Sequence, residues 1–180
     1  PFVYWAEPST IRKLVEHPAF EPSEAAVRKG LRTGDNFRFV RAIWEVPVEN
    51  ITPDISSDES AADRERSYWV PLVLSGASQP WFSPLLTVLN WKSNGKELRQ
   101  YVTKYGSPSR LIQAEDFYFQ PGMSWTLRSA RFIPYTIPSG CIPTGSRPMA
   151  FPVKGNELAA LAKSSSRVAS TFMRFYGDWF

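Results

Sequence analysis

The sequence predicts an α+β fold: a twisted, mainly antiparallel β core, with short helices on its N-terminal side and one longer helix at its C-terminal end. Three observations support this prediction. Sixteen prolines among 180 residues disfavour helix interiors, and aromatic residues, at 14%, favour strands. Strand-like segments also recur at fairly regular intervals, with turn residues between them. The length suffices for one domain with its own core.

Two segments near the N-terminus carry helix signals. Residues 9–18 begin with a Ser-Thr pair that can cap a helix, and they stop at a proline. Residues 23–30 place Ser23 at the N-cap, two cations in the last turn and Gly30 beyond the end. We therefore expect two short helices before the first strand.

The stretch GLRTGDNFRF, residues 30–39, leads from the second helix into the first strand. Residues 33–36 predict a turn, and residues 37–48 have the β-branched and aromatic content of a strand. Asp35 within this turn either orients a neighbouring arginine or stabilises the turn itself. The sequence leaves both alternatives open.

An acidic segment at 49–65 is rich in serine and aspartate and has almost no apolar residues. We expect an exposed loop there, between an N-terminal part at 1–48 and a β-rich core at 66–151. Further strand-like segments follow at 67–74, 84–91, 116–119, 124–138 and 140–143.

The remaining segments predict turns and helices. Residues 93–106 predict a turn that enters a short helix, and residues 120–123 predict a type II turn with proline and glycine at its centre. Residues 155–177 have apolar positions at helical spacing and predict the longer C-terminal helix. Three consecutive serines in its middle weaken the helix pattern.

The net charge of +4 is unevenly distributed. Residues 1–65 carry 8 Lys/Arg and 12 Asp/Glu, a net −4, whereas residues 66–180 carry 13 and 5, a net +8. Cations alternate with aromatic residues at 88–111 and 117–132. Because cations neutralise phosphates and arginine also reads guanine, nucleic-acid binding is the leading interpretation. The alternative is a solvated cationic surface over a β-rich core.

The sequence shows no recognisable catalytic apparatus. The single histidine, His17, adjoins a proline, and with the single cysteine, Cys141, it cannot form a His/Cys zinc site. Neither Gly-x-Gly nor Pro-Pro occurs. One cysteine precludes an internal disulfide and favours a reducing compartment. No apolar run is long enough to span a membrane. The chain starts without Met or a signal peptide, so we expect it to be part of a longer protein.

Five motifs resemble one family in their order along the chain. They are GLRTGDNFRF (30–39), YWVPLVLSG (68–76), VLNWKSNGKELR (88–99), FYFQPGMSW (117–125) and IPSGCIP (137–143). They resemble the region C-terminal to the catalytic domain in large adenine-specific DNA methyltransferases, including those of bacterial phage-exclusion (BREX) systems and fused restriction-modification enzymes. The resemblance implies a target recognition domain, which reads DNA for an enzyme that flips out an adenine.

The resemblance also implies partners and a location. Double-stranded DNA and the catalytic domain of the same parent chain are the expected partners, in the bacterial cytoplasm, with no membrane. The family's Asn/Asp-Pro-Pro-Tyr/Phe motif and S-adenosylmethionine site are missing from this sequence. We therefore expect no cofactor and no catalysis in this segment, and S-adenosylmethionine in the catalytic domain of an N6-adenine methyltransferase parent.

The residues expected to bind DNA fall into two groups. Phosphate contacts are expected from the turn and from nearby cations: Thr33, Gly34, Asn36, Arg38, Lys92, Lys96 and Arg110. Base contacts are expected near the predicted 120–123 turn, from Trp125, Arg128 and Arg131. The main alternative is a protein-interaction module that docks onto the catalytic domain or partner subunits. An independent enzyme would require a site that the sequence does not reveal.

Overall fold

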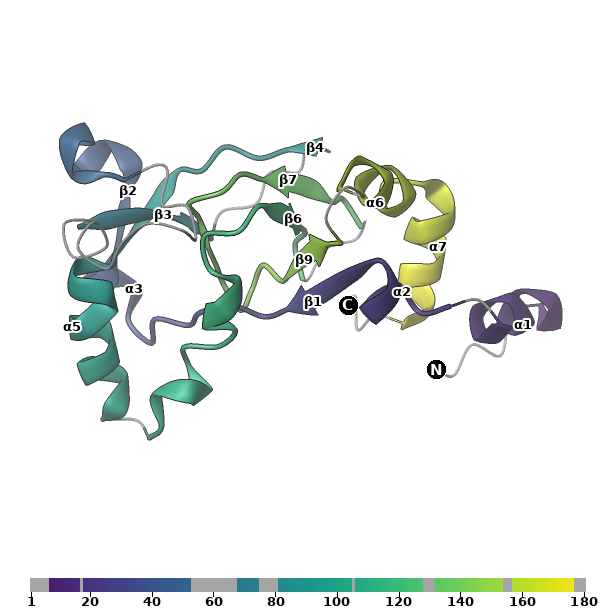
Figure 1. Ribbon diagram of the computed structural model, residues 1–180, viewed down its shortest axis with the longest axis horizontal. Helices are drawn as coiled ribbons and strands as arrows, with labels where there is room; N and C mark the ends of the chain where they lie inside the picture. Colours follow the sequence, from purple (N-terminus) through teal and green to yellow (C-terminus); the bar gives the residue numbers. More distant parts are fainter. Residues whose placement is uncertain are drawn as a thin grey trace.

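The computed structural model describes residues 7–16, 18–52, 68–74, 81–104, 106–127, 132–153 and 157–176. Short strands form two sheets, and helices lie beside and beyond them (Figure 1). This arrangement confirms the predicted α+β fold with a mainly antiparallel core. In the part of the chain that is described, no helix is both long and apolar enough to cross a membrane.

The first sheet has five strands in the order β1-β9-β6-β7-β4, and the second has four in the order β2-β5-β3-β8. The pairs β3–β8 and β4–β7 are parallel, and the other pairs are antiparallel. The strands are β1 (Ala25–Arg28), β2 (Val40–Ala42), β3 (Trp69–Val73), β4 (Trp81–Phe82), β5 (Thr87–Asn90), β6 (Gly122–Ser124), β7 (Tyr135–Ile137), β8 (Ile142–Pro143) and β9 (Met149–Pro152).

The helical elements are short, apart from one beside the second sheet. They are α1 (Pro8–Glu16), α2 (Phe20–Ser23), α3 (Asn36–Phe39), α5 (Lys92–Thr103), α6 (Glu157–Ser164) and α7 (Arg167–Tyr176), with 3-10 turns η1 (Ile43–Glu45), η2 (Val48–Asn50), η3 (Pro108–Arg110) and η4 (Glu115–Phe117). The predicted helices at 9–18 and 93–106 correspond to α1 and α5. The entry to α5 is left-handed at residues 93–95, as the Ser-Asn-Gly sequence allows.

The segment 23–30, predicted as a helix, is instead strand β1. It pairs antiparallel with β9, so that Ala25 faces Pro152 and Arg28 faces Met149. Ala25 is buried in a cluster with β-sheet residues of β6 and β9. Long-range pairing therefore outweighs the local capping pattern. Gly30 ends no helix; it is required because a Cβ there would lie 2.0 Å from the carbonyl oxygen of Pro143.

Three other local predictions need correction. Of the predicted strand 37–48, only β2 is a strand, and helical turns flank it on both sides. Residues 116–119 form no strand, because 116–117 belong to the 3-10 turn η4 and 118–119 to the turn that follows it. The type II turn at 120–123 is wrong, because Gly122 begins β6 and Phe119 takes the left-handed conformation, with φ 67°.

The C-terminal tail is helical, as predicted, but it is divided into α6 and α7. The break falls at the serines, where Ser166 Oγ accepts a hydrogen bond of 3.0 Å from the backbone N–H of Ala169. A serine at an N-cap position satisfies a donor that a continuous helix would bond internally. The serine run therefore starts a new helix.

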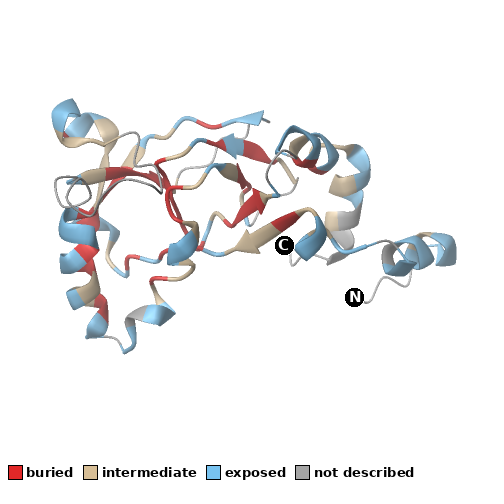
Figure 2. Ribbon diagram, in the orientation of Figure 1, coloured by how far each residue is buried: buried red, intermediate tan, exposed pale blue. Residues whose placement is uncertain are grey.

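Buried residues concentrate along the two sheets (Figure 2). One cluster lies between the second sheet and α5 and includes Trp91, Leu98 and Ile142. Others lie along the first sheet, and one of these includes Val73 of β3. The chain passes from the second sheet to the first between β8 and β9. The turn that makes this connection, residues 144–147, is where the candidate site lies.

Candidate functional site

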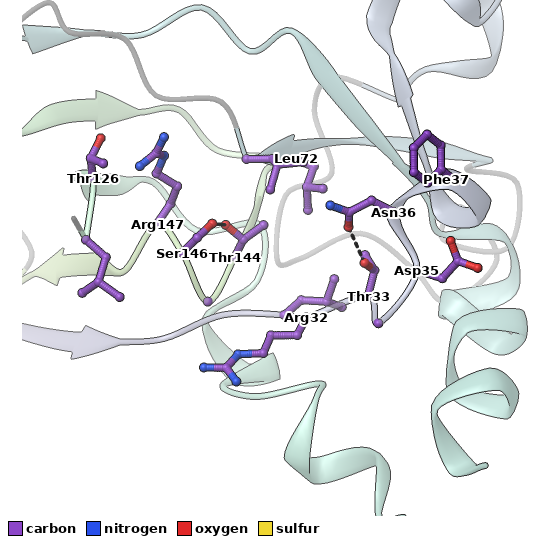
Figure 3. Close-up of a pocket in the computed structure, with 15 residues that line it drawn as sticks. Arg32, Thr33, Asp35, Asn36, Phe37, Leu72, Thr126, Thr144, Ser146 and Arg147 are labelled. Carbon is purple, nitrogen blue, oxygen red and sulfur yellow. Dashed lines mark hydrogen bonds between the residues drawn. The ribbon is translucent and has the colours of Figure 1, made fainter. Parts of the chain in front are cut away.

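A groove of about 830 Å³ opens beside the connection between the two sheets (Figure 3). Four segments line it: residues 31–37, Leu72 in β3 with Leu74 just after it, residues 126–127, and the turn 144–147. Polar and cationic side chains from the first and last of these segments surround an apolar floor. The groove therefore unites parts of the chain that are distant in sequence.

Backbone hydrogen bonds hold two of these segments together. The N–H of Leu31 donates to the carbonyl of Pro143 at 2.9 Å, and the N–H of Gly145 donates to the carbonyl of Leu31 at 3.0 Å. Leu31 itself is buried in the core around Trp91. Because both the backbone and the side chain of Leu31 are fixed, this side of the groove is well ordered.

The 33–36 turn is stabilised from within. Asp35 Oδ1 accepts a hydrogen bond of 3.1 Å from the backbone N–H of Arg38, as an N-cap does for α3. The hydroxyl of Thr33 donates to Oδ1 of Asn36. Of the two roles that the sequence left open for Asp35, the structure supports stabilisation of the turn. Figure 3 shows its carboxylate on the outer side of the turn, away from Arg147.

Two arginines line the groove, and neither forms an ion pair within the described residues. The exposed side chain of Arg32 passes over Gly145, where a Cβ would lie 2.8 Å from its Nε. Arg147 is half-buried, and its Nε is enclosed without a hydrogen-bond partner in the described part of the chain. Figure 3 shows the guanidinium groups of Arg32 and Arg147 on opposite sides of the 144–147 turn. An arginine without an ion-pair partner keeps a positive charge with which an anionic ligand can pair.

Hydroxyl groups add donors and acceptors around Arg147. Thr144 donates its hydroxyl to the carbonyl of Val73 at 2.7 Å, and its oxygen lies 3.3 Å from the Ser146 hydroxyl. Burial raises the pKa of Tyr135, while the Ser124 hydroxyl and the positive charge of Arg147 act in the opposite direction. The positive charge of Arg147 therefore acts on Tyr135, a buried residue of β7 in the first sheet.

The described residues offer little for covalent or metal chemistry. No group of three or more His, Cys, Asp or Glu residues in that part of the chain is placed to hold a metal ion. Burial raises the pKa of the Cys141 thiol to about 12, so the thiol stays protonated and unreactive at neutral pH. Within the described residues, the charged side chains that line the groove are Arg32, Asp35 and Arg147.

The structure brings together three of the residues predicted to bind DNA. Thr33, Gly34 and Asn36 line the groove, facing the turn that carries Arg147. Residues 126–127 also line it and lead directly to Arg128. Arg128 and Arg131 lie outside the described residues.

The other predicted residues lie elsewhere. Arg38 binds Glu97 Oε1 through Nε at 3.0 Å and Nη2 at 2.7 Å. Lys92 Nζ lies 4.3 Å from the centroid of the Tyr68 ring. Trp125 is buried, with its ring 5.6 Å from that of Phe132 in an edge-to-face contact. Lys96 on α5 and Arg110 at the end of η3 are exposed, and neither lines the groove.

Sequence reasoning missed Arg32, Phe37 and Arg147. The first two lie in the stretch 30–39, but nothing local distinguishes them from the neighbouring Arg38 and Phe39. The Thr-Gly-Ser-Arg sequence at 144–147 is a tight-turn signal that could have drawn attention to Arg147. Its position beside residue 31 comes from an isolated parallel bridge between Leu31 and Thr144, which no local pattern reveals.

Comparison with known proteins relates this chain to one segment of much larger adenine-specific methyltransferases. It is 26% identical over 141 residues to the adenine-specific methyltransferase PglX of Lacticaseibacillus casei (strain Zhang). It is 28% identical over 130 residues to the adenine-specific methyltransferase BrxX of Escherichia coli O9:H4 (strain HS). The matches cover 74% and 72% of this chain but only 11% and 9% of those proteins, so the chain spans about a tenth of their length. No family model matches the chain.

These matches agree with the family that the motifs resemble. At 26% and 28% identity they indicate distant homology to methyltransferases of this class over most of the chain.

Proposed function

We propose that this chain is a DNA-binding target recognition region of a larger adenine-specific DNA methyltransferase in a restriction-modification or phage-defence system. The observation that carries the proposal is the groove, in which Arg32 and Arg147 lack ion-pair partners among the described residues. The distant homology to adenine-specific methyltransferases supports the class of the parent protein.

The chemistry of the groove suits a phosphodiester backbone. Guanidinium groups bind phosphate oxygens through paired hydrogen bonds, and hydroxyl and amide groups add neutral contacts. The predicted turn residues Thr33, Gly34 and Asn36 provide such groups on one wall, and Thr126 and Ser146 provide them elsewhere. A bound strand would thus lie between the turn and the segment that leads to Arg128, where the predicted base contacts begin.

This role assigns DNA recognition and catalysis to different parts of the parent protein. In the proposal, this chain contributes no catalytic group, and S-adenosylmethionine binds the catalytic domain elsewhere in the parent. The chain recognises double-stranded DNA and positions it so that the catalytic domain acts on an adenine. The catalytic domain is therefore the second proposed partner.

The test is a titration of the parent protein with duplex DNA over a series of salt concentrations. Each lost phosphate contact reduces the magnitude of the slope of log K against log[salt] by about 0.9. We expect Arg32→Gln and Arg147→Gln each to cause such a reduction. Lys163→Gln is the control, because it removes the same charge from α6, where Lys163 binds Glu24. Undetectable DNA binding by the wild-type parent, or a flat salt dependence, would contradict the proposal.

A second candidate function is docking onto another protein, and β4 is the observation that favours it. Trp81 and Phe82 make up this edge strand and are 61% and 66% exposed. An apolar, unpaired strand edge is a common protein-binding surface. The test is co-purification with a separately expressed catalytic domain, which Trp81→Ser with Phe82→Ser should disrupt. Unchanged co-purification would count against this surface.

A further inference from the structure

Phe37 has the highest exposed fraction of any large apolar side chain in the described residues, at 95%. It belongs to α3 and lines the groove at the end of the 33–36 turn. Figure 3 shows its ring projecting beside Asn36. Exposing a whole phenyl ring to water forgoes the free energy that its burial would release, so the position calls for an explanation.

The local structure fixes this exposure. Phe39, two residues later, is completely buried in the core around Trp91. Two residues correspond to about 200° around a helix, so a buried Phe39 directs Phe37 outward. Nη1 of Arg41 donates to the carbonyl of Phe37 at 2.6 Å, and Asp35 caps the same turn. The ring is therefore presented by a braced turn that cannot readily rotate it inward.

The surroundings of Phe37 are cationic. The segment 28–41 carries five Lys or Arg residues and one acid, Asp35. Arg28 pairs with Glu21 and Arg38 pairs with Glu97, which leaves Lys29, Arg32 and Arg41 without an ion pair among the described residues. The carboxylate of Asp35 accepts the hydrogen bond that caps α3. Arg147 lines the same groove. Positive charge around a lone aromatic ring suits a polyanion with flat apolar groups better than it suits an apolar protein surface.

We propose that Phe37 wedges into one base step of the duplex DNA that lies in this groove and stacks on the nucleobase face that it uncovers. This inference rests on the proposed function. The arginines hold the phosphates, and the braced ring fixes the position of one base relative to them. Stacking needs no particular base because every base has a π-face, so Phe37 sets the register of the DNA rather than its sequence.

The test compares Phe37 variants of the parent protein in binding to duplex DNA across a salt series. Base–aromatic stacking contributes roughly 5- to 150-fold in affinity, so Phe37→Ala should weaken binding by about 10-fold or more. The salt slope should stay unchanged, because no phosphate contact is lost. Phe37→Tyr and Phe37→Trp should restore most of the affinity, and Phe37→Leu should not. Leu158→Ala is the control, since Leu158 is 82% exposed on α6.

A second measurement locates the contact. Duplexes with 2-aminopurine at successive positions should show a change of fluorescence at one position with the wild-type protein, and this change should be lost with Phe37→Ala. Equal affinity of Phe37→Ala and the wild type would overturn the stacking role. If the arginine variants still weaken binding in that case, the proposed function stands.

Two other outcomes are equally decisive. If the wild-type parent binds no DNA, the proposed function itself fails, and the stacking role fails with it. If Phe37→Ala instead releases this region from the catalytic domain in a limited-proteolysis and co-purification assay, the ring contacts protein, and the stacking role is wrong.

Discussion

Replacing Gly30 with alanine tests the junction on which the groove is built. A Cβ at Gly30 would lie 2.0 Å from the carbonyl oxygen of Pro143 and 2.3 Å from its carbonyl carbon, far inside normal contact distance. Because both obstructing atoms belong to the backbone, the two segments must separate. The bond from Leu31 N–H to the Pro143 carbonyl then breaks, and the bond from Gly145 N–H to the Leu31 carbonyl is strained.

The expected cost follows from these losses. Two net hydrogen bonds contribute about 1 kcal/mol each, and displacing the buried Leu31 side chain adds about 1–2 kcal/mol. Gly30→Ala should therefore lower the free energy of unfolding by about 3–4 kcal/mol. Urea unfolding of the 180-residue chain measures this value, provided that the m-value is unchanged.

Gly145→Ala provides a matched control at the same junction. Its Cβ would meet the flexible side chain of Arg32, at 2.8 Å from Nε, rather than backbone. We expect a change of less than about 1 kcal/mol, because the arginine can move aside. If the two alanine variants lose similar amounts of stability, the reasoning from backbone contact is refuted.

Three further predictions concern single groups. Asp35→Ala should lower the free energy of unfolding by about 1 kcal/mol in urea, through loss of the α3 cap, and an unchanged midpoint would contradict that role. Glu97→Gln should release Arg38 from its ion pair and strengthen DNA binding by the parent several-fold at low salt. The free energy of unfolding should change little, because the ion pair is about half exposed. Weaker DNA binding by this variant would instead show that the ion pair orders the surface. Cys141 should resist thiol reagents at pH 8 in the folded chain and react on unfolding. The pKa of the Cys141 thiol is about 12 in the folded chain, above the unfolded value of 9.0. The contribution of this thiol to the free energy of unfolding is therefore complete below pH 9 and declines between pH 9 and 12. Urea titrations at a series of pH values would detect the decline.

The sequence was informative where the signal is local. Fold class follows from composition and spacing, and the helix at 93–106 follows from the turn residues at its start and Gly106 at its end. The helix expected at 23–30 was wrong, because strong caps and a basic last turn cannot reveal that β9 pairs with this segment. Gly30 shows the same limit. A glycine near a helix signal suggests a C-cap, whereas its actual constraint is the Pro143 carbonyl.

The candidate site was predicted only in part, because some of its residues form a local motif and others depend on contacts between distant segments. The turn 33–36 is a compact local motif, and three of the predicted residues in it line the groove. The groove also needs Arg147, which depends on the bridge between Leu31 and Thr144. For Arg38, composition indicated a free cation, but the structure pairs it with Glu97 from α5. Pairing of charges across distant elements is a tertiary property that spacing does not encode.

The pairing of β1 with β9 also affects how the chain reaches its fold during synthesis. β1 leaves the ribosome early, but its partner β9 follows roughly 120 residues later, which takes about 6 to 24 s at bacterial rates of elongation. Throughout that interval β1 has no partner in its sheet, because β9 is its only neighbour there among the described strands. Strand pairing between distant segments is slow to form and exposes unpaired edges meanwhile. A chain that stops short of residue 149 would therefore leave its first strand available for pairing with other molecules.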